Sequence, residues 1–233
     1  MIFRQLFDAA SSTYTYLIAD PASGQAALID PVIEQIDRDL RLVEELGLRL
    51  THVLDTHVHA DHVTASGALR ERTGCTVING EGGAWCADRH VRHGDEVRVG
   101  GIVIQVLATP GHTDDSVSYL VGDRVFTGDA LLVRGTGRTD FQNGDAGQLW
   151  ESITRVLFSL PDETLVYPAH DYRGHTVSTI GEEKRHNPRV AGKSREEFAT
   201  IMANLGLPRP RLIDVAVPAN RACGIVDQQA PSH

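Results

Sequence analysis

The segment His57-Val58-His59-Ala60-Asp61-His62 carries three imidazole groups and one carboxylate within six consecutive residues. It follows directly after an apolar run at residues 50–54. Polar side chains this dense beside a buried strand are typical of a metal site, and imidazole is a ligand for zinc, copper, iron and nickel. The carboxylate favours the harder metals among these. The segment therefore predicts a metal centre.

Three further residues lie in similar positions farther along the chain. His112, Asp129 and His170 each follow a glycine or an alanine, just past an apolar run with β character. Taken singly, each would more often be an ordinary turn or core residue. Loops at the carboxyl ends of strands are, however, where layered α/β folds gather their ligands. The candidate ligands are therefore His57, His59, Asp61, His62, His112, Asp129 and His170.

The hydrophobic pattern predicts a mixed α/β chain that can position these groups. Runs rich in aromatic and β-branched residues predict strands at 2–7, 13–19, 26–29, 50–55, 76–78, 96–99, 102–107, 117–121, 125–129 and 164–167. Apolar residues at every third or fourth position predict helices at 34–46, 63–72 and 145–160, and a capping box at Ser194 predicts another at 194–205. The first three strands should be antiparallel, and Gly100-Gly101 should close a hairpin.

Each half of the chain runs strands first and then a helix, without a linker or low-complexity segment between the halves. Two sheets packed face to face, with helices on the outer faces, would bury both apolar sheet surfaces. We therefore expect a single α/β domain over residues 1–233.

Composition excludes several classes of function. The chain has 233 residues, of which 41% are hydrophobic and 23% charged, as in ordinary globular proteins. Its net charge of −9 argues against a nucleic-acid partner, because phosphate binding needs a basic surface. No run approaches the ~18 apolar residues that would span a membrane.

The cysteines and the N-terminus bear on the compartment. Cys75, Cys86 and Cys223 are odd in number and widely spaced, and indicate neither a disulfide framework nor a thiolate zinc site. The first residues lack the basic and apolar regions of a secretory signal. A reducing, cytoplasmic setting is the expectation.

The segment at residues 57–62 resembles the HxHxDH signature of the metallo-β-lactamase superfamily, with His112, Asp129 and His170 in the expected order and separation. The resemblance implies a four-layer αβ/βα sandwich. In that superfamily these seven residues typically hold two metals, which lower the pKa of a bound water and stabilise the developing oxyanion during hydrolysis. Spacing alone also predicts two metals here, because every ligand for a second one is present.

Within that superfamily the chain resembles the persulfide dioxygenases, which oxidise glutathione persulfide with O₂ to sulfite and glutathione. The resemblance is carried by residues 127–135, 137–142, 167–172, 187–189 and 217–224. It implies one Fe(II) per chain, held by His57, His112 and Asp129 in a 2-His-1-carboxylate triad. The remaining candidates would then orient the ligands and tune the iron: His59, Asp61, His62 and His170.

The same resemblance implies how the substrate is held. Tyr172 and Arg189 would contact the glutathione moiety, since an arginine fork suits carboxylates. Arg138 would either bind substrate or hold the loop beside Asp129, and a structural role is favoured for Cys223. Family habit favours a homodimer. Some relatives carry a fused rhodanese domain, for which this length leaves no room, so such a sulfurtransferase would be a separate chain.

Two alternatives remain open from the sequence. One is a glyoxalase II-like thiolester hydrolase with two metals, which resembles this chain through the same ligands. Those hydrolases typically append a sizeable helical domain, whereas only 63 residues follow His170 here and they predict one clear helix. The other is a non-catalytic metal-binding or sensor protein, against which a complete ligand set with open positions argues.

Overall fold

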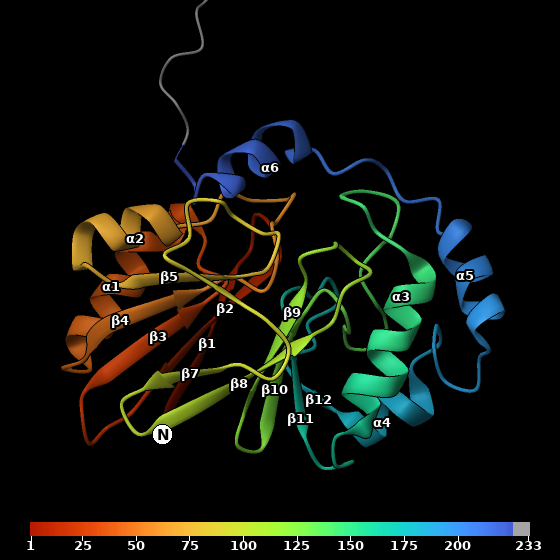
Figure 1. The fold of residues 1–233 in the computed structure, drawn as a ribbon, viewed down its shortest axis with the longest axis horizontal. Helices are drawn as coiled ribbons and strands as arrows, with labels where there is room; N and C mark the ends of the chain where they lie inside the picture. The colour runs from red at the N-terminus through yellow and green to blue at the C-terminus, as the bar shows by residue number, and fades with distance from the viewer. Residues whose placement is uncertain (226–233) are drawn as a thin grey trace, which may run out of the picture.

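The structure, a computed structural model, describes residues 1–225. It contains two six-stranded sheets that face each other (Figure 1). The first sheet has the order β1 (Ile2–Asp8), β2 (Thr13–Ala19), β3 (Gln25–Ile29), β4 (Arg49–Leu54), β5 (Thr76–Gly80), β6 (Arg89–Val91). The second has the order β12 (Ser178–Thr179), β11 (Leu165–Pro168), β10 (Arg124–Gly128), β9 (Val117–Val121), β8 (Ile102–Ala108), β7 (Glu96–Val99).

Both sheets combine parallel and antiparallel strands. In the first, β1, β2 and β3 are antiparallel, while β3 to β6 run parallel. In the second, only β10 and β11 are parallel, and β7 and β8 form the predicted hairpin. Parallel neighbours bring their carboxyl ends to the same edge of a sheet, which is where the candidate ligands follow their strands.

Strand β2 shows how the sequence builds the layers, because all seven of its residues are buried. Successive side chains of a strand point to opposite faces. Tyr16 and Ile18 pack between the two sheets with Phe126, whereas Leu17 and Ala19 pack on the other face, under the helices. A strand covered on both faces loses the polar alternation of a half-exposed strand.

Helices cover the two outer faces, which confirms the four-layer sandwich (Figure 1). On the first sheet lie α1 (Ile36–Glu45) and α2 (Ser66–Thr73), whose Val43 and Leu69 pack against that sheet's outer face. On the second lie α3 (Ala146–Glu151), α4 (Ile180–His186) and α5 (Arg195–Ala203). Phe198 of α5 packs there with Val125 and Val166.

Several elements differ from the predictions. The predicted helix at 145–160 is α-helical only in α3, and then continues as a π-helical turn (Ser152–Val156) and a 3-10 turn (Leu157–Ser159). A 3-10 turn (Ile33–Gln35) precedes α1, and α2 begins three residues later than predicted. Strands β6 and β12 are too short to show a period of two. The expectation of one domain over 1–233 stays a prediction, since residues 226–233 lie outside the described part.

Residues 171–225 form three helices in the structure, whereas the sequence predicts one clear helix after His170. Helix α4 has a largely polar sequence, so apolar periodicity could not reveal it. Helix α6 (Ile213–Arg221) contains Pro218, a residue that normally argues against a helix interior. Within residues 1–225, no helix is both long and apolar enough to cross a membrane.

The expectation that the cysteines form no disulfide is wrong for two of them. Cys86 and Cys223 form a disulfide with their Cα atoms 5.9 Å apart, while Cys75 is free and buried. The two bonded residues are separated by 137 positions in the sequence. Only the fold brings them together, so spacing could not have indicated the pair. The favoured structural role of Cys223 agrees with this bond.

Candidate metal centre

All seven candidate ligands meet at the edge of the two sheets where β4, β8, β10 and β11 end. They fall into two groups, and within each group the candidate ligand atoms lie within 4.8 Å of one another. The first group is His57, His112 and Asp129; the second is His59, Asp61, His62 and His170. Strand ends thus place residues from four separate stretches of chain in one site.

In the first group, each imidazole has a partner on Nδ1. His57 Nδ1 lies 3.0 Å from Thr56 Oγ1, whose hydroxyl donates to Asp30 Oδ2 at 2.9 Å. Since that hydroxyl proton points to Asp30, Thr56 can only accept from His57. His112 Nδ1 donates to the carbonyl oxygen of Arg138 at 2.6 Å. In the neutral form of either ring, a proton on Nδ1 leaves Nε2 bare, and bare Nε2 is the atom with which imidazole binds a metal.

The charges of the first group also suit a cation. Burial, together with neighbouring His59 and His112, holds the pKa of His57 well below its usual range, so the ring is neutral. Burial alone would raise the pKa of Asp129, but His170 and the other two rings bring it below its usual range. Metal ligands must be deprotonated, and both groups meet that condition.

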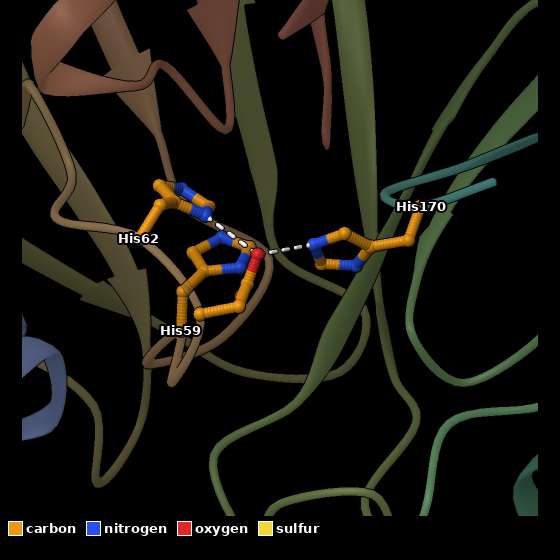
Figure 2. A group of neighbouring side chains, drawn as sticks. His59, His62 and His170 are labelled. Atoms are coloured by element: carbon orange, nitrogen blue, oxygen red, sulfur yellow. Dashed lines mark hydrogen bonds and ion pairs between the residues drawn. The ribbon is translucent and has the colours of Figure 1, made fainter. Parts of the chain in front are cut away.

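In the second group, His170 lies between two carboxylates. Its Nδ1 is 2.7 Å from Asp129 Oδ1 and its Nε2 is 2.8 Å from Asp61 Oδ2. Figure 2 shows His59 and His62 on one side and His170 on the other, with dashed lines from His62 and His170 to one oxygen. Burial lowers the pKa of His170, but the two carboxylates raise it well above the usual value. Both ring nitrogens of His170 are thus engaged.

His59 and His62 differ from His170 in having one free nitrogen each. His59 Nε2 donates to Asp30 Oδ1 at 3.1 Å, and His62 Nδ1 lies 3.2 Å from Asp61 Oδ2. His59 Nδ1 and His62 Nε2 are buried and lack a hydrogen-bond partner among residues 1–225. Buried polar atoms normally have a partner, so these two offer places for a ligand or a cation. The ligand atoms of the first group therefore fit a metal. In the second group, both nitrogens of His170 are already hydrogen-bonded.

Sequence reasoning missed Asp30 and Thr56, which lie under the first two motif histidines. Asp30 is 1% exposed and accepts from Thr56 N at 2.7 Å, from Thr56 Oγ1 and from His59 Nε2. A signal was present, because Asp30 directly follows an apolar strand, as the ligands do. Thr13 was also missed; its hydroxyl is 3.1 Å from His170 Nε2 and 3.3 Å from Asp61 Oδ2.

Three residues are expected to bind substrate: Arg138, Arg189 and Tyr172. They differ in how far their side chains are already held by hydrogen bonds within the protein. The Arg138 guanidinium pairs with both Asp140 oxygens, at 2.6 and 2.7 Å, and donates to Pro208 O at 2.6 Å. Arg189 Nη1 donates to Thr136 O at 2.6 Å, on the loop after Asp129. Tyr172 is 71% exposed, and its ring lies nearly parallel to that of His170, with centroids 6.2 Å apart. Tyr172 is thus the most open of the three.

The loop at residues 130–138 approaches the centre closely at Gly137. A Cβ atom there would lie 2.6 Å from His112 Nδ1 and 2.5 Å from Asp129 O. We expect Gly137→Ala to displace the His112 ring, to lower metal affinity by ~10-fold, and to lower the free energy of unfolding by ~1–3 kcal/mol. Metal titration and thermal melting measure the two effects.

Gly135 offers a matched control two residues away. A Cβ atom at that position would meet only the Leu132 Cβ, at 3.8 Å, which is an ordinary contact. Gly135→Ala should change the free energy of unfolding by less than ~0.5 kcal/mol and leave metal binding as it is. Equal metal affinities for the two variants would show that close packing at Gly137 does not position His112.

Comparison with known proteins identifies the family. A model of the metallo-beta-lactamase superfamily matches residues 9–84 and 87–170, and the chain belongs to that superfamily. Its sequence is 51% identical over 229 residues to the human protein named persulfide dioxygenase ETHE1, mitochondrial, covering 97% of this chain and 89% of that protein. The crystal structure of ETHE1 from Myxococcus xanthus is similar, with a TM-score of 0.96 and 77% identity over 97% of this chain and 100% of the other.

A hydrolase of the same superfamily matches less of the chain. The hydroxyacylglutathione hydrolase of Rhodospirillum rubrum is 38% identical over 167 residues, which are 70% of this chain and 63% of that protein. The match to the human persulfide dioxygenase is therefore both closer in identity and longer than this one.

Proposed function

We propose that this chain is a persulfide dioxygenase, which oxidises the terminal sulfur of glutathione persulfide with O₂. One persulfide, one O₂ and one water give sulfite and glutathione. The observation that carries the proposal is the 51% identity with a protein of that name over 97% of the chain. The site supports it, because a 2-His-1-carboxylate set is typical of non-haem iron oxygenases.

We propose one Fe(II) per chain, with His57 Nε2, His112 Nε2 and an Asp129 oxygen as its ligands. Iron(II) held by these three residues would supply the redox chemistry of the reaction. The Nδ1 partners of the two histidines fix the ring orientations that this set needs. In the superfamily, His170 would be a ligand of a second metal. Its two nitrogens are hydrogen-bonded to Asp61 and Asp129 instead, which disfavours a second metal.

The remaining site residues support the triad in this proposal. His170 links Asp129 to Asp61, which limits the rotation of the Asp129 carboxylate. His59 and His62 are buried, and His62 Nδ1 lies 3.2 Å from the partly exposed Asp61 carboxylate. Arg138 presents its carbonyl oxygen to His112 and anchors its own side chain away from it, which favours a loop-holding role over substrate binding.

Metal analysis and oxygen uptake test this function together. Protein produced without added metal should hold one iron per chain and consume O₂ when given glutathione persulfide, with sulfite as product. No uptake by iron-loaded, folded protein would overturn the proposal. An absence of O₂ uptake would favour the alternative hypothesis of a non-catalytic metal-binding or sensor protein.

The competing function is a hydroxyacylglutathione hydrolase with two metals. It is favoured by the two unpaired buried nitrogens, His59 Nδ1 and His62 Nε2, which could bind a second cation. Two metals per chain, together with hydrolysis of S-lactoylglutathione, would establish it in place of the dioxygenase. His62→Ala separates the two further, since it should leave the iron content of a one-metal enzyme at one per chain.

Tyr172 is the candidate whose removal tests substrate contact most directly. Because its side chain is largely exposed, Tyr172→Ala should leave the melting temperature unchanged. We expect it to raise KM for glutathione persulfide by up to ~10-fold, the size of one aromatic stacking contact. Tyr172→Phe, which keeps the ring, is the matched control in steady-state kinetics. A large fall in kcat at constant KM would instead assign the ring to positioning His170.

We propose a cytoplasmic location, a homodimer and a rhodanese-type sulfurtransferase on a separate chain as supplier of persulfide. The resemblance to persulfide dioxygenases supports the last two. Light scattering at several protein concentrations would test the dimer.

A further inference from the structure

Helix α6 contacts the backbone of the histidine motif through one buried side chain. Asn220 is 3% exposed, and its Nδ2 donates to His59 O at 2.9 Å and to His62 O at 2.8 Å. Its Oδ1 accepts from Thr64 N at 2.8 Å. One amide thus holds three backbone groups of the loop that carries His59, Asp61 and His62. The proposed function gives no role to this part of the chain.

The backbone just after α6 also packs closely on the residues beyond the motif. Gly67 N donates to Cys223 O at 2.8 Å. A Cβ atom on Gly67 would lie 2.6 Å from Cys223 O, and one on Gly224 would lie 2.0 Å from Thr64 O. Glycines at both positions therefore allow the end of α6 to sit directly against residues 64–67.

A disulfide joins the same end of α6 to the first sheet. Cys223 is bonded to Cys86, in the segment between β5 and β6, and Trp85 N donates to Arg221 O at 3.0 Å. The opposite face of α6 is open, with Val215 55% exposed. The disulfide at Cys223, three residues after Asn220, therefore fixes the end of α6 from which Asn220 contacts the loop with His59 and His62.

We propose that the Cys86–Cys223 disulfide is a thiol-sensitive clamp on the loop that carries His59, Asp61 and His62. In this proposal Asn220 is the positioning residue, and the disulfide holds it in place. Disulfides of reducing compartments are usually transient and redox-sensing. Cys86 is partly exposed and Cys223 is 1% exposed, so an incoming thiolate reaches Cys86 first. The clamp acts on the position of the loop and takes no part in the reaction at the metal centre.

The chemistry of release is ordinary thiol–disulfide exchange with a low-molecular-weight thiol. A thiolate attacks the Cys86 sulfur, the bond to Cys223 breaks, and its electron pair stays on the Cys223 sulfur, which takes a proton from water. A second thiolate attacks the sulfur of the small molecule bound to Cys86. The products are two protein thiols and one small-molecule disulfide. Two thiols are oxidised and one protein disulfide is reduced.

Hydrogen exchange of the metal-free protein, measured by mass spectrometry, tests the clamp without any activity assay. The oxidised protein is compared with protein reduced by dithiothreitol, which is then removed without air. Amides at residues 59–66 and 213–224 should exchange ~10-fold faster after reduction, because local opening governs exchange. Amides of β2 and α3 should be unchanged. Equal exchange in both states, or free thiols at Cys86 in protein purified without reductant, would overturn the proposal.

Variants separate the disulfide from the side chain that it secures. Cys86→Ser should show the fast exchange of reduced protein and should not respond to dithiothreitol. Asn220→Ala should open residues 59–64 even with the disulfide intact and should release iron to a chelator several-fold faster. Asn220→Asp keeps the acceptor for Thr64 N but loses both donations, and serves where the alanine variant does not fold.

Two residues outside the clamp provide matched controls. Cys75→Ala removes the buried cysteine that is not in the disulfide, and Asn204→Ala removes an amide that donates only to Thr200 O, one turn earlier on α5. Both should leave exchange at residues 59–64 and iron release unchanged. If Asn220→Ala accelerated exchange evenly across the protein, Asn220 would have a general structural role and the positioning assignment would be wrong.

Discussion

Replacing Asp129 with alanine should remove iron and oxygenase activity together. The variant loses a candidate metal ligand, and it also leaves His170 Nδ1 without the carboxylate that lies 2.7 Å away. Removing a group that merely supports a ligand lowers metal affinity by ~10–100-fold, so losing the ligand itself should lower it by at least ~100-fold. Iron content after desalting and O₂ uptake with glutathione persulfide measure both effects.

The control for Asp129 is another aspartate that directly follows a glycine. Asp123 lies in the turn between β9 and β10, and its side chain is 68% exposed. Asp123→Ala should keep iron and activity at the level of the unmodified protein. An Asp129→Ala protein that remained active and iron-replete would show that the triad is assigned to the wrong residues.

The fold and the set of candidate ligands could be predicted because the signals for them are local. Strands such as β2 and β8 are short apolar runs in the sequence, and the dense motif marks a metal site without any knowledge of contacts. The division of the ligands into two groups is different in kind. His57 and His59 lie two residues apart, but they enter different groups. Asp30, which follows β3 in another part of the chain, hydrogen-bonds His59 directly and reaches His57 through Thr56.

Helix α6 and its disulfide show the same limit. Pro218 hides the helix from propensity rules, and the Cys86–Cys223 bond joins positions 137 residues apart. Neither the partners of Asn220 nor the exposure of the two cysteines has a local sequence signal. The spacing of residues in the sequence therefore could not predict that Asn220, Cys86 and Cys223 contact the histidine motif or support it.

Asp30→Asn should lower iron affinity by ~10–100-fold with little effect on stability. Asp30 has a φ angle of 51°, and asparagine tolerates that region, so the backbone should be kept. Thr56 N is a fixed donor 2.7 Å from Asp30 Oδ1, so the amide oxygen of the variant must occupy that side. The amide nitrogen then replaces Oδ2 and faces the Thr56 hydroxyl.

That replacement reverses the direction of the hydrogen bonds toward His57. In the native protein the Thr56 hydroxyl donates to Asp30 and accepts from His57 Nδ1. In the variant it would accept from the amide and donate to Nδ1, which forces the proton of the neutral ring onto Nε2. A protonated Nε2 cannot bind the metal. The control is Asp214, an exposed aspartate on α6. The variant Asp214→Asn should keep full iron affinity.

The reversal can be observed apart from iron binding. Nitrogen-15 NMR of the metal-free protein should place the His57 proton on Nδ1 in the native chain and on Nε2 in Asp30→Asn. Thr56→Ser keeps the hydroxyl that links the two residues, so it should retain the native tautomer and native iron affinity. Unchanged iron affinity in an Asp30→Asn protein whose His57 tautomer had switched would show that His57 is not a ligand. An unswitched tautomer would instead show that Asp30 does not control the ring.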